Sequence, residues 1–204
     1  MKYKKEWIYG FFILFITILM ILFVDVPLAN IIKTNINQKT INIFSKLTVF
    51  GSFSYIVLMN VAILLYLLIK QNKEKTRFML AAIVSQSLTA IIIQILKFIF
   101  GRARPFYFLQ NNLTSSFTFL NFQSNFVSFP SGHSAGMWAL ITCLLIIFKD
   151  NKYSKLLIIP AFIISLSRLI LNVHFLSDVF IGSILGIVLA KFFYAKILNI
   201  KLKK

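Results

Sequence analysis

The sequence predicts an all-α, polytopic membrane protein with six transmembrane helices. Of its 204 residues, 59% are hydrophobic and 16% aromatic, whereas only 13% are charged. A soluble domain has about twice that share of charged residues. No linker, repeat or polar block is long enough to mark a second unit, so residues 1–204 are expected to form a single membrane domain.

Six apolar runs have the length of roughly 17–25 residues that a helix needs to cross a bilayer. They are Trp7–Val24, Ser52–Ile69, Phe78–Leu96, Ser131–Phe148, Lys155–Asn172 and Asp178–Ile197. The last two runs contain Arg168, Lys191 and Lys196, but a basic side chain near a span's end can reach the headgroups. The first run exceeds the usual core of a signal peptide and lacks a convincing cleavage site, so it is expected to be a retained helix.

Two segments between the runs are predicted to lie outside the membrane. Asp25–Thr48 is too polar to span, and its scattered Ile and Leu residues favour a helix or turn at the interface. Pro105–Phe129 has no charge but many Asn, Ser, Thr and Phe residues. It fits an ordinary loop or an amphiphilic rim over which a lipid headgroup would reach a site.

The basic residues predict the orientation in the membrane. A net charge of +17 would suggest a nucleic-acid partner in a soluble protein, but here the charges flank apolar runs. They therefore indicate topology and contact with anionic lipids, with no nucleic acid. With the N-terminus inside, 15 of the Lys and Arg residues lie on the inner side, including Lys201, Lys203 and Lys204, and seven lie outside. This bias predicts that both termini are cytoplasmic.

The two histidines of the chain lie in polar clusters on the predicted outer side. His174 and Asp178 are four residues apart, so on a helix they would share a face. A carboxylate beside an imidazole fixes its tautomer and raises its basicity. An isolated pair of this kind is commonly a surface ion pair. However, the chain has only five acidic residues, and ionisable groups at membrane depth are usually functional.

The second histidine follows the sequence Pro130-Ser131-Gly132 at the start of an apolar run. Proline suits a helix start, and the unpaired N–H groups there attract anions. Glycine allows close approach of the anion, and His133 would then project beside it as a proton donor. A plain helix start with a capping serine is the alternative.

Three cations, Lys97, Arg104 and Arg168, are candidates to clamp an anion. Arginine offers forked donors to phosphate oxygens, and lysine adds a mobile charge. These residues gather on the side that the positive-inside bias disfavours. For Arg102 we favour a simple role as an anchor to the headgroups.

No metal site or cofactor is predicted. The five acids are scattered, and the single cysteine, Cys143, lies inside an apolar run. These residues offer no carboxylate pair for a two-metal site.

The three clusters together resemble the signature of the type 2 phosphatidic acid phosphatase family. The matching pattern, within residues 97–178, is Lys97-x6-Arg104-Pro105, then Pro130-Ser131-Gly132-His133, then Ser167-Arg168-x5-His174-x3-Asp178. The order and the internal spacings agree. The sequence Phe50-Gly51-Ser52 is a weaker match. Leu176 departs from the proline that many members have there, but this removes no functional group.

The resemblance implies a six-helix membrane core and a metal-independent, two-step phosphatase. The orientation predicted from the basic residues places the catalytic site at the extracytoplasmic interface. By position, His174 would attack phosphorus to form a phosphohistidine, with Asp178 orienting it. His133 would protonate the leaving group and then activate water. The phosphoryl oxygens would be bound by the remaining signature residues: Lys97, Arg104, Ser131, Gly132, Arg168 and, as a further candidate, Ser167.

The expected substrate is a lipid phosphate or pyrophosphate at the outer leaflet of the cell membrane. Undecaprenyl pyrophosphate, phosphatidylglycerol phosphate and phosphatidic acid are the candidates, and the oligomeric state stays open. Alternatives are a lipid phosphotransferase, a non-catalytic transporter of phosphate or lipid, and a vanadate-dependent haloperoxidase. The intact histidines argue against transport. The membrane-embedded chain argues against the haloperoxidase.

Overall fold

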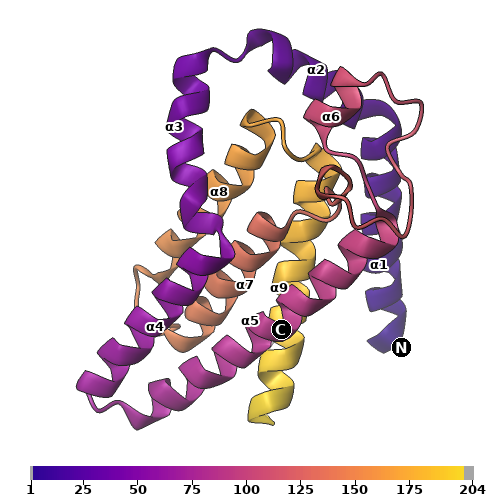
Figure 1. The fold of residues 1–204 in the computed structure, drawn as a ribbon. Coiled ribbons are helices and arrows are strands. Elements are labelled where there is room, and N and C mark those ends of the chain that lie inside the picture. The colour runs from indigo at the N-terminus through magenta and orange to yellow at the C-terminus, as the bar shows by residue number, and fades with distance from the viewer. Residues whose placement is uncertain (1, 200–204) are drawn as a thin grey trace.

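The computed structural model describes residues 2–199, and its regular elements there are helical, which confirms the predicted all-α class (Figure 1). The α-helices are α1 (Lys2–Leu19), α2 (Asp25–Asn35), α3 (Gln38–Thr48), α4 (Phe53–Ile69), α5 (Lys73–Phe100), α6 (Pro105–Gln110), α7 (Gly132–Ile147), α8 (Ile158–Ile170) and α9 (Leu176–Leu198). Short π or 3-10 segments are η1 (Met20–Val24), η2 (Val49–Gly51), η3 (Ser124–Phe126) and η4 (Ser154–Leu157). Lys201, Lys203 and Lys204, which were counted in the inner set, lie outside the described residues.

Each of the six apolar runs contains a helix, but the helices differ in length. Three stretches are long and apolar enough to cross a membrane: Trp7–Asn35, Lys73–Phe100 and Leu176–Leu198. The stretch Gln38–Gly51 and α4, which meet at a bend of 53°, form a fourth if they are counted as one broken span. The helices of the fourth and fifth runs are shorter, with 16 residues in α7 and 13 in α8.

The first helix does not end at Val24, and this predicted boundary is wrong. The chain continues through the π-helical η1 into α2, so that one helical stretch reaches Asn35. The N–H of Asp25 bonds to the carbonyl of Met20, five residues back. Asp25 itself is buried, and an ion pair with Arg102 compensates its charge inside this stretch.

The segment that follows is helical, as expected for Asp25–Thr48. It is divided between α2 and α3, and α3 packs against α8. Pro105–Phe129 is mainly loop, with the short α6 and η3. These elements lie together at one end of the bundle (Figure 1).

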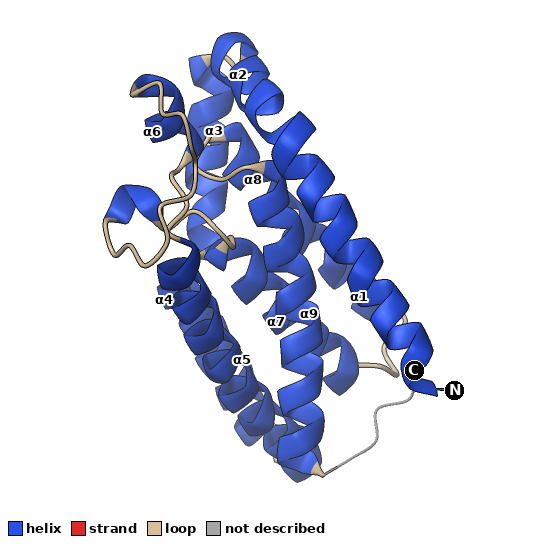
Figure 2. Cartoon of the chain, turned by 90° about the vertical axis from the view of Figure 1, so that its right-hand side faces the viewer, coloured by secondary structure: helices blue, strands red, loops and turns tan. Residues whose placement is uncertain are grey.

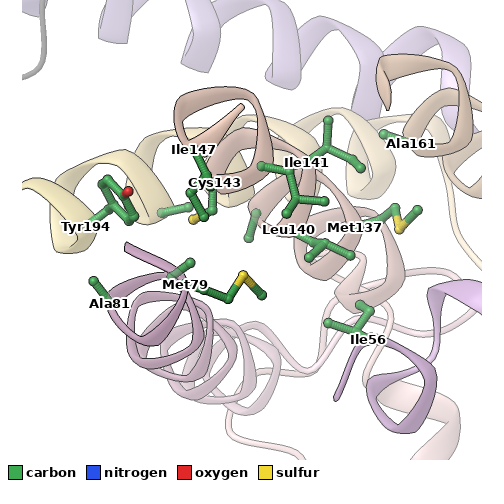
Figure 3. Packing of buried hydrophobic residues seen from close by; sticks show 14 of the residues in the cluster. Ile56, Met79, Ala81, Met137, Leu140, Ile141, Cys143, Ile147, Ala161 and Tyr194 are labelled. Atoms are coloured by element: carbon green, nitrogen blue, oxygen red, sulfur yellow. The ribbon is translucent and has the colours of Figure 1, made fainter. Parts of the chain in front are cut away.

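Helix α7 is the centre of the bundle. Most of its side chains are buried, and α5, α8 and α9 pack around it. The apolar core is formed by Met137, Leu140 and Ile141 of α7 together with Met79 of α5 and Tyr194 of α9 (Figure 3). The interior therefore depends on one short helix that neighbours shield from the surroundings.

Two glycines allow α9 to approach α7 closely. A Cβ at Gly182 would lie 2.5 Å from the carbonyl oxygen of Ser131, and one at Gly186 would overlap the carbonyl of Ala135. The two glycines are four residues apart and face the same side of α9. This spacing of small residues is typical of helix pairs packed within membranes.

Helix α1 lies along the outside of the bundle (Figure 2). From Trp7 onward its aromatic side chains point outward, and Trp7 is 79% exposed. A continuous apolar surface of this kind suits contact with lipid. The start of α1 and the end of α9 both lie at the bundle end opposite to α2, α3 and α6 (Figure 1).

We expect Gly186→Ala to lower the free energy of unfolding by about 1–3 kcal/mol, the usual cost of overpacking. Thermal unfolding in detergent, followed by circular dichroism, measures the change. Gly10→Ala is the matched control, because nothing lies within 4 Å of a Cβ at Gly10. Equal stability of the two variants would contradict the close contact between α7 and α9.

Candidate active site

The three polar clusters converge where α5 and α8 end and where α7 and α9 begin. Gly101 ends α5 in the left-handed conformation, with φ of +50°, and turns the chain toward Arg104. The N–H of Ser131 donates to the carbonyl of Asp178 at 3.0 Å, which joins the starts of α7 and α9. Signature residues that are up to 81 positions apart in the sequence therefore form one site.

His174 and Asp178 lie together. The predicted sharing of a helix face is wrong, however. His174 lies in the turn before α9, whereas Asp178 is in the first turn of that helix. The Asp178 carboxylate accepts the N–H of Phe175 at 2.8 Å, and its Oδ2 lies 3.6 Å from His174 Nδ1. The pair is thus formed by a capped helix start rather than by helical spacing.

Ser128 completes this pair and was missed in the sequence analysis. Its hydroxyl donates to Asp178 Oδ2 at 2.5 Å and lies 3.3 Å from His174 Nδ1. Two acceptors therefore face Nδ1, which favours a proton on Nδ1 and leaves Nε2 with a free lone pair. The only sequence signal was a serine two positions before the Pro130-Ser131-Gly132 motif.

Burial keeps the His174 imidazole neutral. The side chain is nearly inaccessible to solvent, and desolvation is the main reason that its pKa falls to about 3. Asp178 acts in the opposite direction, while the charges of Lys97 and Arg168 lower the pKa further. A neutral imidazole has the lone pair that a nucleophile needs.

Ser131 is the N-cap of α7, and its hydroxyl accepts the N–H of Ser134 at 3.4 Å. The side chain is fully buried. Gly132 and His133, which follow it, line a cavity. A Cβ at Gly132 would lie 3.5 Å from Lys97 Cε, so the helix start and this cation are neighbours.

Three cations line the same cavity: Lys97, Arg104 and Arg168. Lys97 Nζ donates to the carbonyl of Val127, and Arg168 Nη1 donates to Thr48 Oγ1 at 2.6 Å. Among the side chains described, those of residues 7–199, none of the three forms an ion pair with a carboxylate. The buried Nε of Arg168 also lacks a partner among these residues. The cations are therefore available for an anion in the cavity.

Ser167 lies next to Arg168 but does not face the cavity. Its hydroxyl donates to the carbonyl of Ile164 at 2.6 Å, within α8. Gly51, from the weaker motif match, lines the cavity beside His133. A Cβ at Gly51 would overlap Ile164, so glycine lets the α3–α4 junction approach the site.

The interpretation of Arg102 as a headgroup anchor is wrong. Its side chain is only 1% exposed, and its guanidinium lies between two buried carboxylates. Nη1 donates to Asp178 Oδ1 at 2.5 Å, and Nη2 donates to Asp25 Oδ2 at 2.8 Å. No local pattern indicates this pairing, because Asp25 is 77 residues away and belongs to a segment predicted to lie at the interface.

The cavity has a volume of about 490 Å³, within the range of small-molecule sites. The catalytic candidates lie at one end, and the rest of the cavity extends between α4 and α5 as far as Ile83 and Gln86. Ile83 and Lys97 are 14 residues apart on α5, which corresponds to about 21 Å. Phe53 and Val57 of α4 line the cavity and are also exposed, so it opens sideways between these helices.

No group of three or more His, Cys, Asp or Glu residues in the described part of the chain is placed to hold a metal ion. Cys143 is buried in the core and is not among the residues that line the cavity. The chemistry that the site offers is therefore that of two imidazoles, one carboxylate and three cations.

Comparison with known proteins identifies phosphatases among the relatives of this chain. Lipid A 1-phosphatase of Rhizobium etli is 26% identical over 151 residues, which cover 69% of this chain and 64% of that protein. The Rhizobium johnstonii lipid A 1-phosphatase matches at the same identity and covers 61% of its own length. The match thus spans less than two thirds of these relatives.

Two solved structures share the fold. The crystal structure of Aquifex aeolicus LpxE has a TM-score of 0.62 and 25% identity, covering 83% of this chain and 94% of that chain. The crystal structure of a transmembrane PAP2-type phosphatidylglycerolphosphate phosphatase from Bacillus subtilis has a TM-score of 0.72 and 22% identity, covering 96% of both chains. The second similarity shows the fold alone.

The apolar helices and these neighbours indicate a multi-pass membrane protein. The model of the PAP2 superfamily matches residues 78–201, which include all three signature clusters and more than half of the sequence. The predicted resemblance is confirmed, and the chain belongs to the PAP2 superfamily.

Proposed function

We propose that this protein is a metal-independent membrane phosphatase that hydrolyses lipid phosphates or pyrophosphates through a phosphohistidine at His174. The observation that carries the proposal is a neutral histidine, oriented by Asp178 and Ser128, at the end of a cavity with three cations that have no carboxylate partner among the side chains of residues 7–199. This end of the cavity has a nucleophile and an anion site, and the remainder can hold an apolar chain.

The reaction would proceed in two displacements at phosphorus. His174 Nε2 attacks phosphorus, and the bond to the leaving oxygen breaks while His133 gives that oxygen a proton. Water then attacks the phosphohistidine, the P–N bond breaks, and His133 takes a proton from the water. The phosphoryl group beside His133 favours its protonated form before the first step.

The cations would stabilise the negative charge on the equatorial oxygens of the transition state. Lys97, Arg104 and Arg168 lie around the cavity end, and the N–H groups at the start of α7 add partial positive charge. This arrangement supplies the role that a metal ion has in many other phosphatases. Ser131 would contribute through its position as the cap of α7.

A lipid substrate is favoured by the shape of the cavity and by the relatives. The lining between α4 and α5 is mainly apolar and opens to the side that lipid would cover. The names of the relatives refer to lipid A 1-phosphatase and to phosphatidylglycerolphosphate phosphatase. The substrates to compare are therefore lipid A, phosphatidylglycerol phosphate, undecaprenyl pyrophosphate and phosphatidic acid.

Transfer of the phosphoryl group to another lipid is the second candidate function, because the same intermediate would react with an alcohol. Transport without catalysis would need the cations but not the oriented His174. Phosphate release in water distinguishes hydrolysis from both.

We further propose that α1, α4, α5, α7, α8 and α9 each cross the membrane, with the site at the outer interface. The bias of 15 basic residues to seven supports cytoplasmic termini. The start of α1 and the end of α9 lie at the same bundle end, opposite to the site (Figure 1). An even number of crossings is consistent with this arrangement.

His174→Ala should abolish phosphate release from the lipid panel in the presence of EDTA, because the nucleophile is removed. His133→Ala should lower kcat by roughly 10²–10⁴-fold, and less for substrates with good leaving groups. Purified protein in detergent and a phosphate assay give both results. Near-normal turnover by His174→Ala, or complete loss of wild-type activity in EDTA that magnesium restores, would refute the mechanism.

Ala90→Phe should block the apolar part of the cavity that Ala90 lines on α5. We expect kcat/KM for long-chain lipid phosphates to fall at least about tenfold, equivalent to roughly 1.4 kcal/mol. Activity toward a short-chain phosphate ester should be retained. Ala62→Phe is the matched control, because Ala62 is exposed on α4 and is not among the lining residues. Equal losses for both chain lengths would argue against a chain site here.

Labelling of cysteines introduced at exposed positions, in intact cells, tests the sidedness. Thr114→Cys lies in the exposed loop after α6, and Asp150→Cys lies in the exposed connection after α7. We expect an impermeant maleimide to label Thr114→Cys in intact cells, and Asp150→Cys only after the membrane is opened. The wild-type chain is the control because its Cys143 is buried. The opposite pattern would refute an outer-leaflet site.

A further inference from the structure

Two buried residues outside the proposed catalytic set form a network with Asp178. Asp25 follows η1 in the first helical stretch, and Arg102 follows α5. Their side chains bond to each other at 2.8 Å, and both are almost completely inaccessible to solvent. Neither residue lines the cavity, so neither is placed to touch a substrate.

Arg102 is held in one orientation from several directions. Its guanidinium lies between two aromatic rings, with the carbon Cζ 4.8 Å from the centre of the Phe117 ring and 4.3 Å from that of Phe175. Nη1 donates to Ser177 Oγ at 2.7 Å as well as to Asp178. A planar guanidinium suits such a bridging position, in which lysine could not make the same set of bonds.

Arg102 also determines the position of Ser128. The carbonyl of Arg102 accepts the N–H of Ser128 at 2.9 Å, and the Ser128 hydroxyl then bonds to Asp178 Oδ2. The side chain of Arg102 therefore fixes Oδ1 of Asp178, and its backbone fixes the serine that contacts Oδ2. Both acceptors that face His174 Nδ1 depend on this residue.

Asp25 fixes the start of α9, which carries Asp178. Its Oδ1 accepts the N–H of Ser177 at 3.0 Å, and its Oδ2 accepts the Ser177 hydroxyl at 2.5 Å. A carboxylate at this position also interacts favourably with the positive end of the helix dipole. The π-helical η1 immediately precedes Asp25, and such segments are frequent at functional sites.

We propose that Asp25 and Arg102 are positioning residues that set the orientation and charge of Asp178 and, through it, the tautomer of His174. The inference rests on the proposed phosphatase function. It assigns the first helical stretch, which lies outside the matched residues 78–201, a role in the chemistry.

The physical basis is the sharing of one guanidinium by two carboxylates. With Asp25 ionised, Arg102 divides its charge between the two acids, and Asp178 keeps enough negative charge to hold the proton on His174 Nδ1. Without the charge on Asp25, Arg102 would interact with Asp178 alone and weaken that hold. The lone pair on Nε2 would then be present for a smaller fraction of the time.

The test uses Asp25→Asn, which keeps the shape and removes the charge, and Ser177→Ala, which removes a hydroxyl that bonds to both Asp25 and Arg102. We expect kcat to fall about 10- to 100-fold with KM nearly unchanged. That is the range found when a group that orients a metal-binding histidine is removed. Asp150→Asn, an exposed acid in the α7–α8 connection, is the matched control and should keep wild-type kcat.

Nitrogen-15 NMR of histidine-labelled protein gives a readout that a purely structural role would not change. The chain has only two histidines, so a His133→Gln sample assigns the signals. In the wild type we expect a protonated Nδ1 and an unprotonated Nε2 on His174. In Asp25→Asn these two signals should move toward each other as the tautomers mix.

Several outcomes would overturn the inference. One is a folded Asp25→Asn protein with wild-type kcat and unchanged His174 signals. Another is a lower melting temperature with kcat of the folded fraction unchanged. If Asp25→Asn does not fold, the same comparison is decided by Ser177→Ala. A changed tautomer in Asp25→Asn, together with a wild-type protein that has no phosphatase activity, would instead refute the proposed function. The coupling between Asp25 and His174 would remain.

Discussion

The carboxylate of Asp178 is buried where water does not reach it, and the active-site end of the bundle is built around its neutralisation. An uncompensated charge at such a position would cost several kcal/mol. Asp178 receives donors from Arg102 of the α5–α6 connection, from Ser128 before α7 and from the N–H of Phe175 at its own helix start. Its carbonyl accepts the N–H of Ser131. One acid therefore holds together the segments that carry all three signature clusters.

The cavity has the opposite electrostatic character. Lys97, Arg104 and Arg168 lie close enough to repel one another. None of them forms an ion pair with the side chains of residues 7–199. Under the proposed function, binding of a phosphate would relieve that repulsion. The close packing of Gly182 and Gly186 against α7 supplies stability next to it. A rigid helix pair supporting an unsatisfied site is a common arrangement in functional proteins.

The sequence predicted the helical class and most of the signature residues that line the polar end of the cavity, because both depend on local patterns. It did not predict that Ser131 and Ser167 lie outside that lining. Apolar runs identify helices. The spacing from His174 to Asp178 correctly indicated that the two side chains lie together, even though the two residues do not share a helix. What could not be predicted was long-range. The bonds from Asp25 to Ser177 join residues 152 positions apart, and the buried role of Arg102 depends on them. A single arginine near a span gives no local sign of whether it faces lipid headgroups or two carboxylates.

The predicted end of the first span, at Val24, is wrong for the same physical reason. The sequence placed the end of the first span at Val24 because Asp25 is charged, and a charge normally marks the edge of a membrane helix. In the structure, Arg102 and Ser177 satisfy that charge, so the helix can continue past it to Asn35. A polar residue ends a span only when it lacks internal partners.

The lengths of the central helices bear on how a lipid phosphate would reach the site. Helix α7 has 16 residues, about 24 Å at 1.5 Å per residue, whereas the hydrocarbon core is roughly 30 Å thick. If its inner end lies at the inner interface, the anion site proposed at its start lies just inside the outer interface. Moving a charged headgroup to that depth is unfavourable in lipid alone. Three cations that have no carboxylate partner among residues 7–199 would offset this cost. The opening between α4 and α5 would let the chain of the substrate remain in an apolar environment while its phosphate reaches His174.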